Sequence, residues 1–200
     1  MAQGDVRLLL LGGFLLTLSS AWLQRFHHLF HTASGQILDL ACGAGRNSFY
    51  LHSLGLTLLA LDKDVQSLAG LQAKGVETKV HDLEAGESGY DWPFAEHRFA
   101  AIVVCNYLHR PLFPHILASL KPDGVLIYET FAAGNENFGK PSNPAFLLRP
   151  GELLTQMQSN PAVTMSIIAY EEGYVEQPKP AMVQRICARK TGKISVLDKL

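Results

Sequence analysis

Residues 37–47 read Ile-Leu-Asp-Leu-Ala-Cys-Gly-Ala-Gly-Arg-Asn, an apolar run with an acid at Asp39 that leads into the glycine turn Gly43-Ala44-Gly45. The residues that follow, 47–54, have the composition of a helix. A strand, a glycine-rich turn and a helix N-terminus form a concave site whose free backbone N–H groups face a ligand. Glycine permits positive φ angles and a close approach of the ligand to the main chain. This stretch therefore predicts a ligand-binding turn at the end of a strand.

Two further strand-like stretches also end in an acid. The glycine turn alone is a weak signal, because Ser48 occupies the position of the third glycine of a dinucleotide fingerprint. Residues 56–61 are apolar and end at Asp62, which is placed to accept both hydroxyls of a ribose. Residues 76–80 lead to Asp82-Leu83, within reach of an adenine edge. Successive strand ends that each present an acid indicate a nucleoside-containing ligand.

In these motifs the chain resembles the class I S-adenosylmethionine-dependent methyltransferases. The residues that carry the resemblance are Leu38-Asp39-Leu40-Ala41-Cys42-Gly43-Ala44-Gly45, Leu61-Asp62 and His81-Asp82-Leu83. Within that class, Gly45-Arg46-Asn47-Ser48 and Asp62-Lys63-Asp64 are similar to the small tellurite-resistance-type methyltransferases, and residues 129–131 and 139–153 to a bacterial subgroup of uncharacterised members. The resemblance covers roughly residues 20–190. It implies S-adenosyl-L-methionine (SAM) as the cofactor and no particular substrate.

The resemblance and the strand-end positions together imply a set of cofactor-binding residues. Asp62 is expected to bind the ribose, and Asp39 to order the glycine loop and meet the amino-acid part of the cofactor. Arg46 and Asn47 are expected to contact the methionine carboxylate. The alternative for Asp39, Asp82, Arg46 and Asn47 is that they only cap a turn or a helix. The expected set is Asp39, Ala41, Cys42, Gly43, Gly45, Arg46, Asn47, Asp62, Lys63, Asp82, Leu83, Cys105 and Asn106.

Strands and helices alternate along the chain in the manner of βαβ units. Strands are predicted at 37–41, 57–62, 76–80, 100–105, 125–130, 163–170 and 183–189, and helices at 47–54, 65–73, 112–120 and 151–158, with helical spacing also at 20–30. The last two strands are expected to form a closing antiparallel hairpin. The fold class is therefore α/β: a Rossmann-like, seven-stranded, mostly parallel sheet with helices on both faces.

Composition indicates one domain without a global charge footprint. The chain has 200 residues, of which 48% are hydrophobic, and a net charge of −1, so it can build one core and carries no basic surplus for nucleic acid. Its three cysteines show no C-x-x-C spacing, so neither a disulfide framework nor a zinc ribbon is supported. A reducing cytoplasm fits this cysteine usage.

The predicted domain spans residues 20–190 and leaves both ends of the chain outside. Residues 8–18 form an apolar run that is too short to span a bilayer. Residues 1–19 have three interpretations: a segment that covers the domain, a non-native extension from a start codon placed too far upstream, or an export signal. The first two leave the protein cytoplasmic, and no membrane association is expected. Residues 191–200 are expected to form a flexible tail.

Candidate catalytic residues follow the fourth and fifth predicted strands. Tyr107, His109 and Arg110 come after residues 100–105, where ligands gather in open α/β sheets, and Glu129 ends the next strand. His109 is the best candidate for a general base. A histidine exposed to water at a helix start is the equal alternative for it.

A long loop, residues 131–149, carries charged and amide side chains with Phe138 and Phe146 among them. A loop of this length without structure of its own is more often a functional lid than a connector. We expect it to close over the methyl acceptor.

His27, His28 and His31 raise the question of a metal, since His27 and His31 are one helical turn apart. No carboxylate or cysteine completes the set nearby in sequence. A solvated helix face is the favoured interpretation, and no metal site is predicted.

The expected reaction is transfer of a methyl group from SAM to a small-molecule acceptor by in-line displacement, in which alignment of the reacting atoms contributes up to ~7–11 kcal/mol. The Asp/Asn-Pro-Pro-Tyr sequence of enzymes that methylate exocyclic base amines is absent from residues 105–111. Alternatives are an RNA or protein methyltransferase, a non-catalytic SAM-binding module that docks a partner protein, and, more remotely, a nicotinamide-dependent reductase. The oligomeric state stays open.

Overall fold

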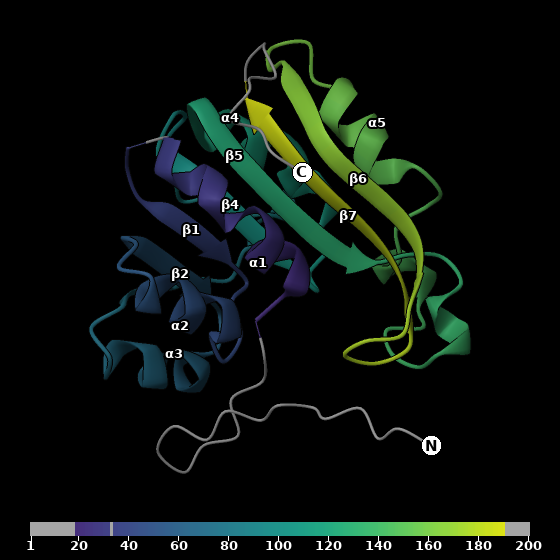
Figure 1. Ribbon diagram of the computed structural model, residues 1–200, viewed down its shortest axis with the longest axis horizontal. Coiled ribbons are helices and arrows are strands. Elements are labelled where there is room, and N and C mark those ends of the chain that lie inside the picture. Colours follow the sequence, from purple (N-terminus) through teal and green to yellow (C-terminus); the bar gives the residue numbers. More distant parts are fainter. Residues whose placement is uncertain (1–18, 33, 191–200) are drawn as a thin grey trace.

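A computed structural model describes residues 19–32 and 34–190, so the predicted tail and all but the last residue of the predicted N-terminal extension lie outside the described residues. Its centre is one seven-stranded sheet with the order β3-β2-β1-β4-β5-β7-β6 (Figure 1). The strands are β1 (Ile37–Leu40), β2 (Leu58–Asp62), β3 (Glu77–Val80), β4 (Phe99–Cys105), β5 (Leu120–Phe131), β6 (Met165–Val175) and β7 (Ala181–Lys190). Neighbours from β3 to β5 are parallel, whereas β7 is antiparallel to both β5 and β6. The predicted Rossmann-like sheet with its closing hairpin is confirmed.

Helices cover both faces of this sheet, as predicted. One group of helices packs on the face toward the viewer in Figure 1: α1 (Ala21–Phe26), the 3-10 helix η1 (His27–Thr32), α2 (Arg46–Ser53) and α3 (Val65–Gln72). A second group packs on the other face: η2 (Arg110–Leu112), α4 (Phe113–Ser119) and α5 (Glu152–Gln158). The central strands are therefore apolar at successive positions. In β1, Leu38 and Leu40 join the core under α4 and α5, and Ile37 joins the core under α1 to α3.

The first helix is shorter than the helical spacing at 20–30 predicts. The Ser20 hydroxyl caps it by accepting from the backbone N–H of Leu23 at 3.2 Å. After Phe26 the chain tightens into η1. Leu29 and Phe30 are nevertheless buried, because the tighter turn still directs them toward the sheet.

Strand β5 begins five residues earlier than predicted, at Leu120 instead of position 125. Leu120 pairs with Phe99, and the ladder resumes with Val125 opposite Ala101 after a shift of register. The residues between them, Lys121-Pro122-Asp123-Gly124, have turn chemistry, and Asp123 has a φ of 63°. The turn therefore exists, but it is a bulge inside the strand and not a break before it.

The loop at 131–149 is not structureless, which corrects the prediction. It contains η3 (Asn135–Asn137) and η4 (Pro144–Phe146), and Ala132 forms a β-bridge with Leu148. The buried Asn135 amide donates to the Pro141 carbonyl at 2.9 Å and accepts from the Met182 N–H at 3.2 Å. The loop is therefore folded onto β7.

None of the helices in the described part of the chain is long and apolar enough to cross a membrane.

Candidate functional site

The crevice of the sheet opens between β1 and β4, which lie side by side while their onward connections lead to opposite edges. Such a switch point is where open α/β sheets bind ligands. The residues that directly follow these two strands, Ala41 and Asn106, have φ angles of 52° and 58°. Positive φ in a residue other than glycine is uncommon, and such strain clusters at functional sites.

Two cavities occupy this crevice. The glycine-turn cavity, of about 300 Å³, is lined by Asp39, Ala41, Cys42, Gly43, Ala44, Arg46, Asn47, Cys105 and Asn106. The strand-end cavity, of about 290 Å³, is lined by Ala41, Leu61, Asp62, Lys63, His81, Asp82, Leu83, Glu84, Asn106 and Tyr107. Ala41 and Asn106 border both. Of the predicted cofactor residues, all but Gly45 therefore line one cavity or both.

The two glycines of the turn have different physical roles. Gly43 and Gly45 have φ angles of 53° and 80°, so both occupy the left-handed region that the glycine turn predicts. A Cβ on Gly45 would lie 2.5 Å from a methyl carbon of Leu71, whereas one on Gly43 would meet no described atom within 4 Å outside its chain neighbours. Gly45 is required by packing against α3, and Gly43 faces the open cavity.

Asp62 lines the strand-end cavity and is hydrogen-bonded to the turn that lines the other one. Its Oδ2 accepts from the backbone N–H of Gly43 at 2.7 Å, and its Oδ1 accepts from the N–H of Asp64 at 2.9 Å. A carboxylate has about four lone-pair sites, so acceptor capacity remains for a diol in the strand-end cavity. The bond to Gly43, which sequence spacing does not indicate, ties the end of β2 to the glycine turn.

Asp39 is buried, and its partner is Ser48 in α2. The Ser48 hydroxyl donates to Asp39 Oδ2 at 2.5 Å. Burial raises the pKa of Asp39 to about 6, although the bond from Ser48 opposes the shift. In the sequence Ser48 is only the residue that replaces a third glycine. Its function is to satisfy a buried acid, and the polar side chain at that position was the available signal.

Asp82 shapes the turn after β3 in addition to bordering the cavity. Its Oδ1 accepts from the Glu84 N–H at 3.1 Å, and its Oδ2 lies 4.0 Å from the Lys63 ammonium. Asp82 thus forms the turn, as the alternative has it, and also borders the cavity, so its predicted place on the adenine side stays a prediction. Glu84 itself borders the cavity and was missed in the sequence, because it follows the strand-end motif by two residues in an exposed turn.

Both cysteines of the crevice are thiols. Cys42 and Cys105 line the glycine-turn cavity. Burial raises the pKa of each thiol well above its usual range, and the neighbouring carboxylates add to the shift. They therefore contribute small apolar walls and no nucleophile.

Asn47 connects the first helix to the crevice. Its Oδ1 accepts from the Ser20 N–H at 3.0 Å, and the Ser20 hydroxyl donates to Glu129 Oε1 at 3.0 Å. The other oxygen of Glu129 lies 3.0 Å from Nε of Arg185. Neither predicted role of Asn47 includes this contact with α1. Glu129, a predicted catalytic residue, is held in this network and lines neither cavity.

Of the other predicted catalytic residues, Tyr107 lies at the crevice and His109 and Arg110 lie away from it. Tyr107 borders the strand-end cavity, and its carbonyl accepts from the Tyr128 hydroxyl at 2.9 Å. His109 Nε2 is 2.8 Å from the Gly89 carbonyl oxygen. His109 lines neither crevice cavity.

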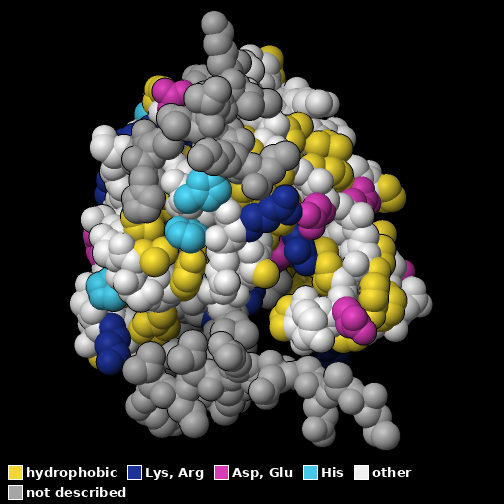
Figure 2. All heavy atoms as spheres, viewed as in Figure 1, with side chains coloured by type: hydrophobic (Ala, Val, Ile, Leu, Met, Phe, Trp, Pro, Cys, Tyr) yellow, Lys and Arg dark blue, Asp and Glu magenta, His cyan; other side chains and the backbone are white. Residues whose placement is uncertain are grey.

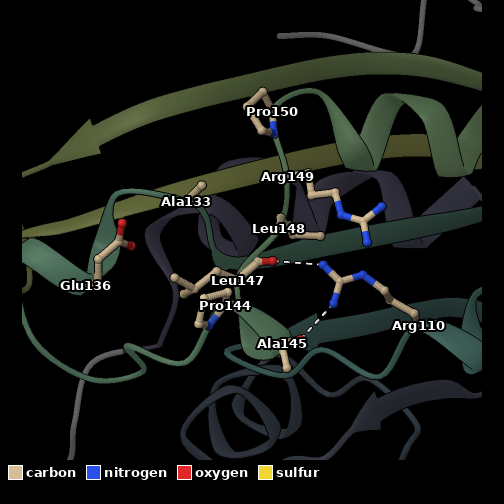
Figure 3. A pocket seen from close by; sticks show the side chains of 9 residues that line it. All are labelled: Arg110, Ala133, Glu136, Pro144, Ala145, Leu147, Leu148, Arg149 and Pro150. Carbon is tan, nitrogen blue, oxygen red and sulfur yellow. Dashed lines mark hydrogen bonds between the residues drawn. The ribbon is translucent and has the colours of Figure 1, made fainter.

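Arg110 is directed at the loop 131–149. Its guanidinium donates to the carbonyls of Ala145 and Leu147 at 2.7 and 2.8 Å (Figure 3). It also binds Glu152 in α5. The cavity that it lines, with a volume of about 360 Å³, is bordered by this loop and the residues just after it and shares no residue with the crevice cavities.

The residues described here contain no group of three or more His, Cys, Asp or Glu side chains placed to hold a metal ion. Nδ1 of His27 lies 2.8 Å from the Gln24 carbonyl oxygen, and Nδ1 of His28 lies 3.0 Å from that of Arg25. The side chain of His31 lies outside the described set.

Comparison with known proteins assigns the chain to a family. The family model of the tellurite resistance protein TehB matches residues 29–135, more than half of the chain. The chain belongs to the TehB family. It is 30% identical over 92 residues to the "probable S-adenosyl-L-methionine-dependent methyltransferase TehB" of Haemophilus influenzae, a match that covers 43% of this chain and 31% of that relative. The chain thus corresponds to about a third of this TehB relative's length.

Solved structures agree with the TehB assignment at the level of the fold. The crystal structure of TehB from Haemophilus influenzae has a TM-score of 0.66 at 19% identity and covers 84% of this chain and 62% of that one. An S-adenosylmethionine-dependent methyltransferase from Mesorhizobium loti has a TM-score of 0.64 at 17% identity, and the match covers 85% of this chain and 98% of that one. These TehB and methyltransferase structures share the Rossmann-like architecture of this chain.

Proposed function

We propose that this TehB-family protein is a SAM-dependent methyltransferase whose cofactor occupies the glycine-turn and strand-end cavities together. The observation that carries the proposal is Asp62, whose carboxylate borders the strand-end cavity and binds the Gly43 N–H of the glycine turn. A nucleoside with an amino-acid extension needs two adjoining cavities, one for each part, and a carboxylate that accepts hydrogen bonds from the ribose diol. The names of the TehB relatives support the same cofactor.

The residues present fit that cofactor. Gly43 leaves open the space where a Cβ would stand, so a bulky ligand can approach the turn. Asp62 would hold the ribose, Leu83 would pack on the adenine side, and Asp39 with Arg46 would face the charged amino-acid end. Bound SAM supplies an electrophilic methyl group on a positively charged sulfur. Asn106 and Tyr107 then have the task of positioning the acceptor, because alignment is the main source of rate enhancement.

A small-molecule acceptor is favoured over RNA or protein. On the face shown in Figure 2, basic and acidic side chains are interspersed over the described surface and form no large patch of one sign. The net charge of −1 gives no overall attraction to a polyanion. A cytoplasmic location, where SAM is made, agrees with this proposal. A nicotinamide-dependent reductase is disfavoured, because Ser48 at the third glycine position is engaged with Asp39.

The test is calorimetric titration of SAM into the Asp62→Ala variant. We expect the affinity to fall at least tenfold, because the diol loses two charge-assisted hydrogen bonds, each worth ~1.5–3 kcal/mol. The matched control is Asp64→Ala. Asp64 lies two residues away, caps α3 through the Gln66 N–H at 3.0 Å, and borders neither cavity. Its replacement is expected to lower stability slightly and to leave SAM affinity unchanged.

Thermal unfolding with each cofactor separates the proposal from its rivals. A ligand that binds only the folded state raises the melting temperature by mass action. We expect stabilisation by SAM and by S-adenosylhomocysteine but not by NADH or NADPH. Equal SAM affinity in Asp62→Ala and the parent protein removes the ribose assignment. Stabilisation by a nicotinamide cofactor alone favours the reductase.

A further inference from the structure

A third cavity, which we call the aromatic cavity, adjoins the crevice under the loop 131–149. Its volume is about 230 Å³. Leu108, Phe131, Pro141 and Phe146 form its apolar wall, and Thr130 contributes a hydroxyl. Among the described residues, Glu84 is the one charged side chain that borders it. Its chemistry differs from that of the two crevice cavities, which are lined by several charged side chains.

Asn106 is the point where all three cavities meet. It borders the glycine-turn, strand-end and aromatic cavities, while Glu84 and Tyr107 border the last two. Its left-handed backbone, with a φ of 58°, and the bond from its N–H to the Glu129 carbonyl at 2.8 Å fix this junction between the ends of β4 and β5. A molecule in the aromatic cavity would therefore face the part of the crevice where the glycine-turn and strand-end cavities meet.

The Tyr107 hydroxyl provides a second observation at the same place. It is buried, and no described residue meets it in good hydrogen-bond geometry, although the Glu84 carboxylate lies close enough to interact with it. Burial raises the pKa of Tyr107, and the nearby Glu84 carboxylate raises it further, so the phenol remains protonated. A buried hydroxyl without a partner is costly, and a ligand with a polar atom at this position would satisfy it.

We infer that the aromatic cavity binds the methyl acceptor, and that the acceptor is a neutral or cationic molecule with an apolar body, not an oxyanion or a carboxylate. The inference rests on the proposed methyltransferase function. Apolar walls match an apolar body, and the Glu84 carboxylate repels an anion. Recognition of an oxyanion requires cationic side chains or convergent N–H groups, and no cationic side chain of the described residues borders this cavity.

The transfer step balances without a further reactant. The lone pair of the acceptor nitrogen, sulfur or oxygen forms the bond to the methyl carbon, and the electron pair of the broken carbon–sulfur bond remains on sulfur as a thioether. A cationic amine first gives one proton to the Glu84 carboxylate, which frees its lone pair, and the methylated product is again an ammonium ion. A thiol or hydroxyl loses its proton to Glu84 as the new bond forms. Glu84 passes the proton to water, since it is exposed. Tyr107 donates to or accepts from the acceptor and is a positioning residue in this step.

The test uses four probes against the full chain saturated with S-adenosylhomocysteine, measured by calorimetry. Three share one body and differ in charge: 2-phenylethylamine, 2-phenylethanethiol and 3-phenylpropionate. The fourth is potassium tellurite. We expect the amine and the thiol to bind at least tenfold more tightly than the carboxylate and the tellurite. Equal binding, a preference for either anion, or binding of no probe overturns the inference.

Reversal of the charge at position 84 tests whether Glu84 sets the preference for the acceptor's charge, as distinct from an effect on folding. Glu84→Lys is expected to weaken the amine at least tenfold, to strengthen the carboxylate, and to leave the neutral thiol within threefold. Glu87→Lys is the matched control, because Glu87 is exposed in the same loop and borders none of the three cavities. An identical response of both variants overturns the role of Glu84. A protein that binds neither SAM nor S-adenosylhomocysteine contradicts the proposed function instead, so the two failures are distinguishable.

Discussion

The guanidinium of Arg110 and the carboxylate of Glu152 form a two-point ion pair, with Nε 2.7 Å from Oε1 and Nη2 2.9 Å from Oε2. Glu152 Oε2 also accepts from the Arg149 N–H at 2.8 Å. The pair connects the start of η2 to the start of α5. Because the same guanidinium binds two carbonyls of the loop 131–149, Arg110 holds in place the loop that borders the aromatic cavity.

Replacement of Arg110 should therefore act first on stability. Arg110→Lys keeps the charge but loses the planar fork, so we expect the free energy of unfolding to fall by about 1–3 kcal/mol. Urea unfolding measures this change. Arg149→Lys is the control, since Arg149 is an exposed arginine that borders the same cavity as Arg110. Stability within 0.5 kcal/mol of the parent, roughly the size of an ordinary surface substitution, would show that the fork is dispensable.

The buried Asp39 makes stability depend on pH. Its pKa is raised to about 6 from an ordinary value of 3.8, so the folded state holds the proton more tightly than the unfolded state does. The stability of the parent relative to Asp39→Asn, which cannot ionise, is therefore fully present below about pH 4 and is lost as pH rises through about 6. We expect a loss of about 2–3 kcal/mol over that window. Urea unfolding of both proteins from pH 4 to 8 tests it.

Ser48→Ala supplies the internal check on Asp39. The hydroxyl of Ser48 lowers the pKa of the carboxyl against the effect of burial. Its removal should move the pH window upward and lower stability most at neutral pH, where the carboxylate would be buried with one partner fewer. A stability difference between parent and Asp39→Asn that does not change with pH would contradict the assignment.

The two glycines of the turn should respond differently to alanine. Gly45→Ala places a methyl group against Leu71 and forces a side chain into positive φ, so we expect a loss of about 2–4 kcal/mol. Gly43→Ala carries only the backbone strain, about 1 kcal/mol, but extends its methyl group into the glycine-turn cavity. Calorimetry should find that Gly43→Ala binds SAM more weakly than the parent, although Gly43→Ala is more stable than Gly45→Ala. Normal affinity there would exclude close contact between the turn and the cofactor.

Tyr107→Phe should stabilise the protein in the absence of ligands. The change deletes a buried hydroxyl that no described residue meets in good hydrogen-bond geometry, with only the Glu84 carboxylate near it, and removal of its desolvation penalty is expected to gain up to about 1 kcal/mol. The same change should weaken the 2-phenylethanethiol complex. Thermal and urea unfolding of the apo protein give the first readout. A loss of stability would mean that the hydroxyl is already satisfied.

Much of the fold can be predicted from the chain because its signals are local. The turn Gly43-Ala44-Gly45 and the acids Asp39 and Asp62 lie within one βαβ unit, where strand, turn and helix follow from short-range spacing. The same locality explains the errors. Residues 121–124 have turn chemistry that predicts a connection between a helix and a strand, and only the pairing of Leu120 with Phe99 shows that the strand begins before them.

The amino-acid order by itself thus determined the class of fold and the glycine turn and strand ends that line the crevice cavities, because periodicity and turn chemistry act between near neighbours. Tertiary structure alone decided the partners: Ser48 for Asp39, Glu152 for Arg110, Ser20 for Asn47, and the joining of Glu84 and Tyr107 to the loop 131–149 in one cavity. These contacts mostly join elements far apart in the chain. Packing of helices and loops on the sheet creates them, and no local pattern encodes which side chains will meet.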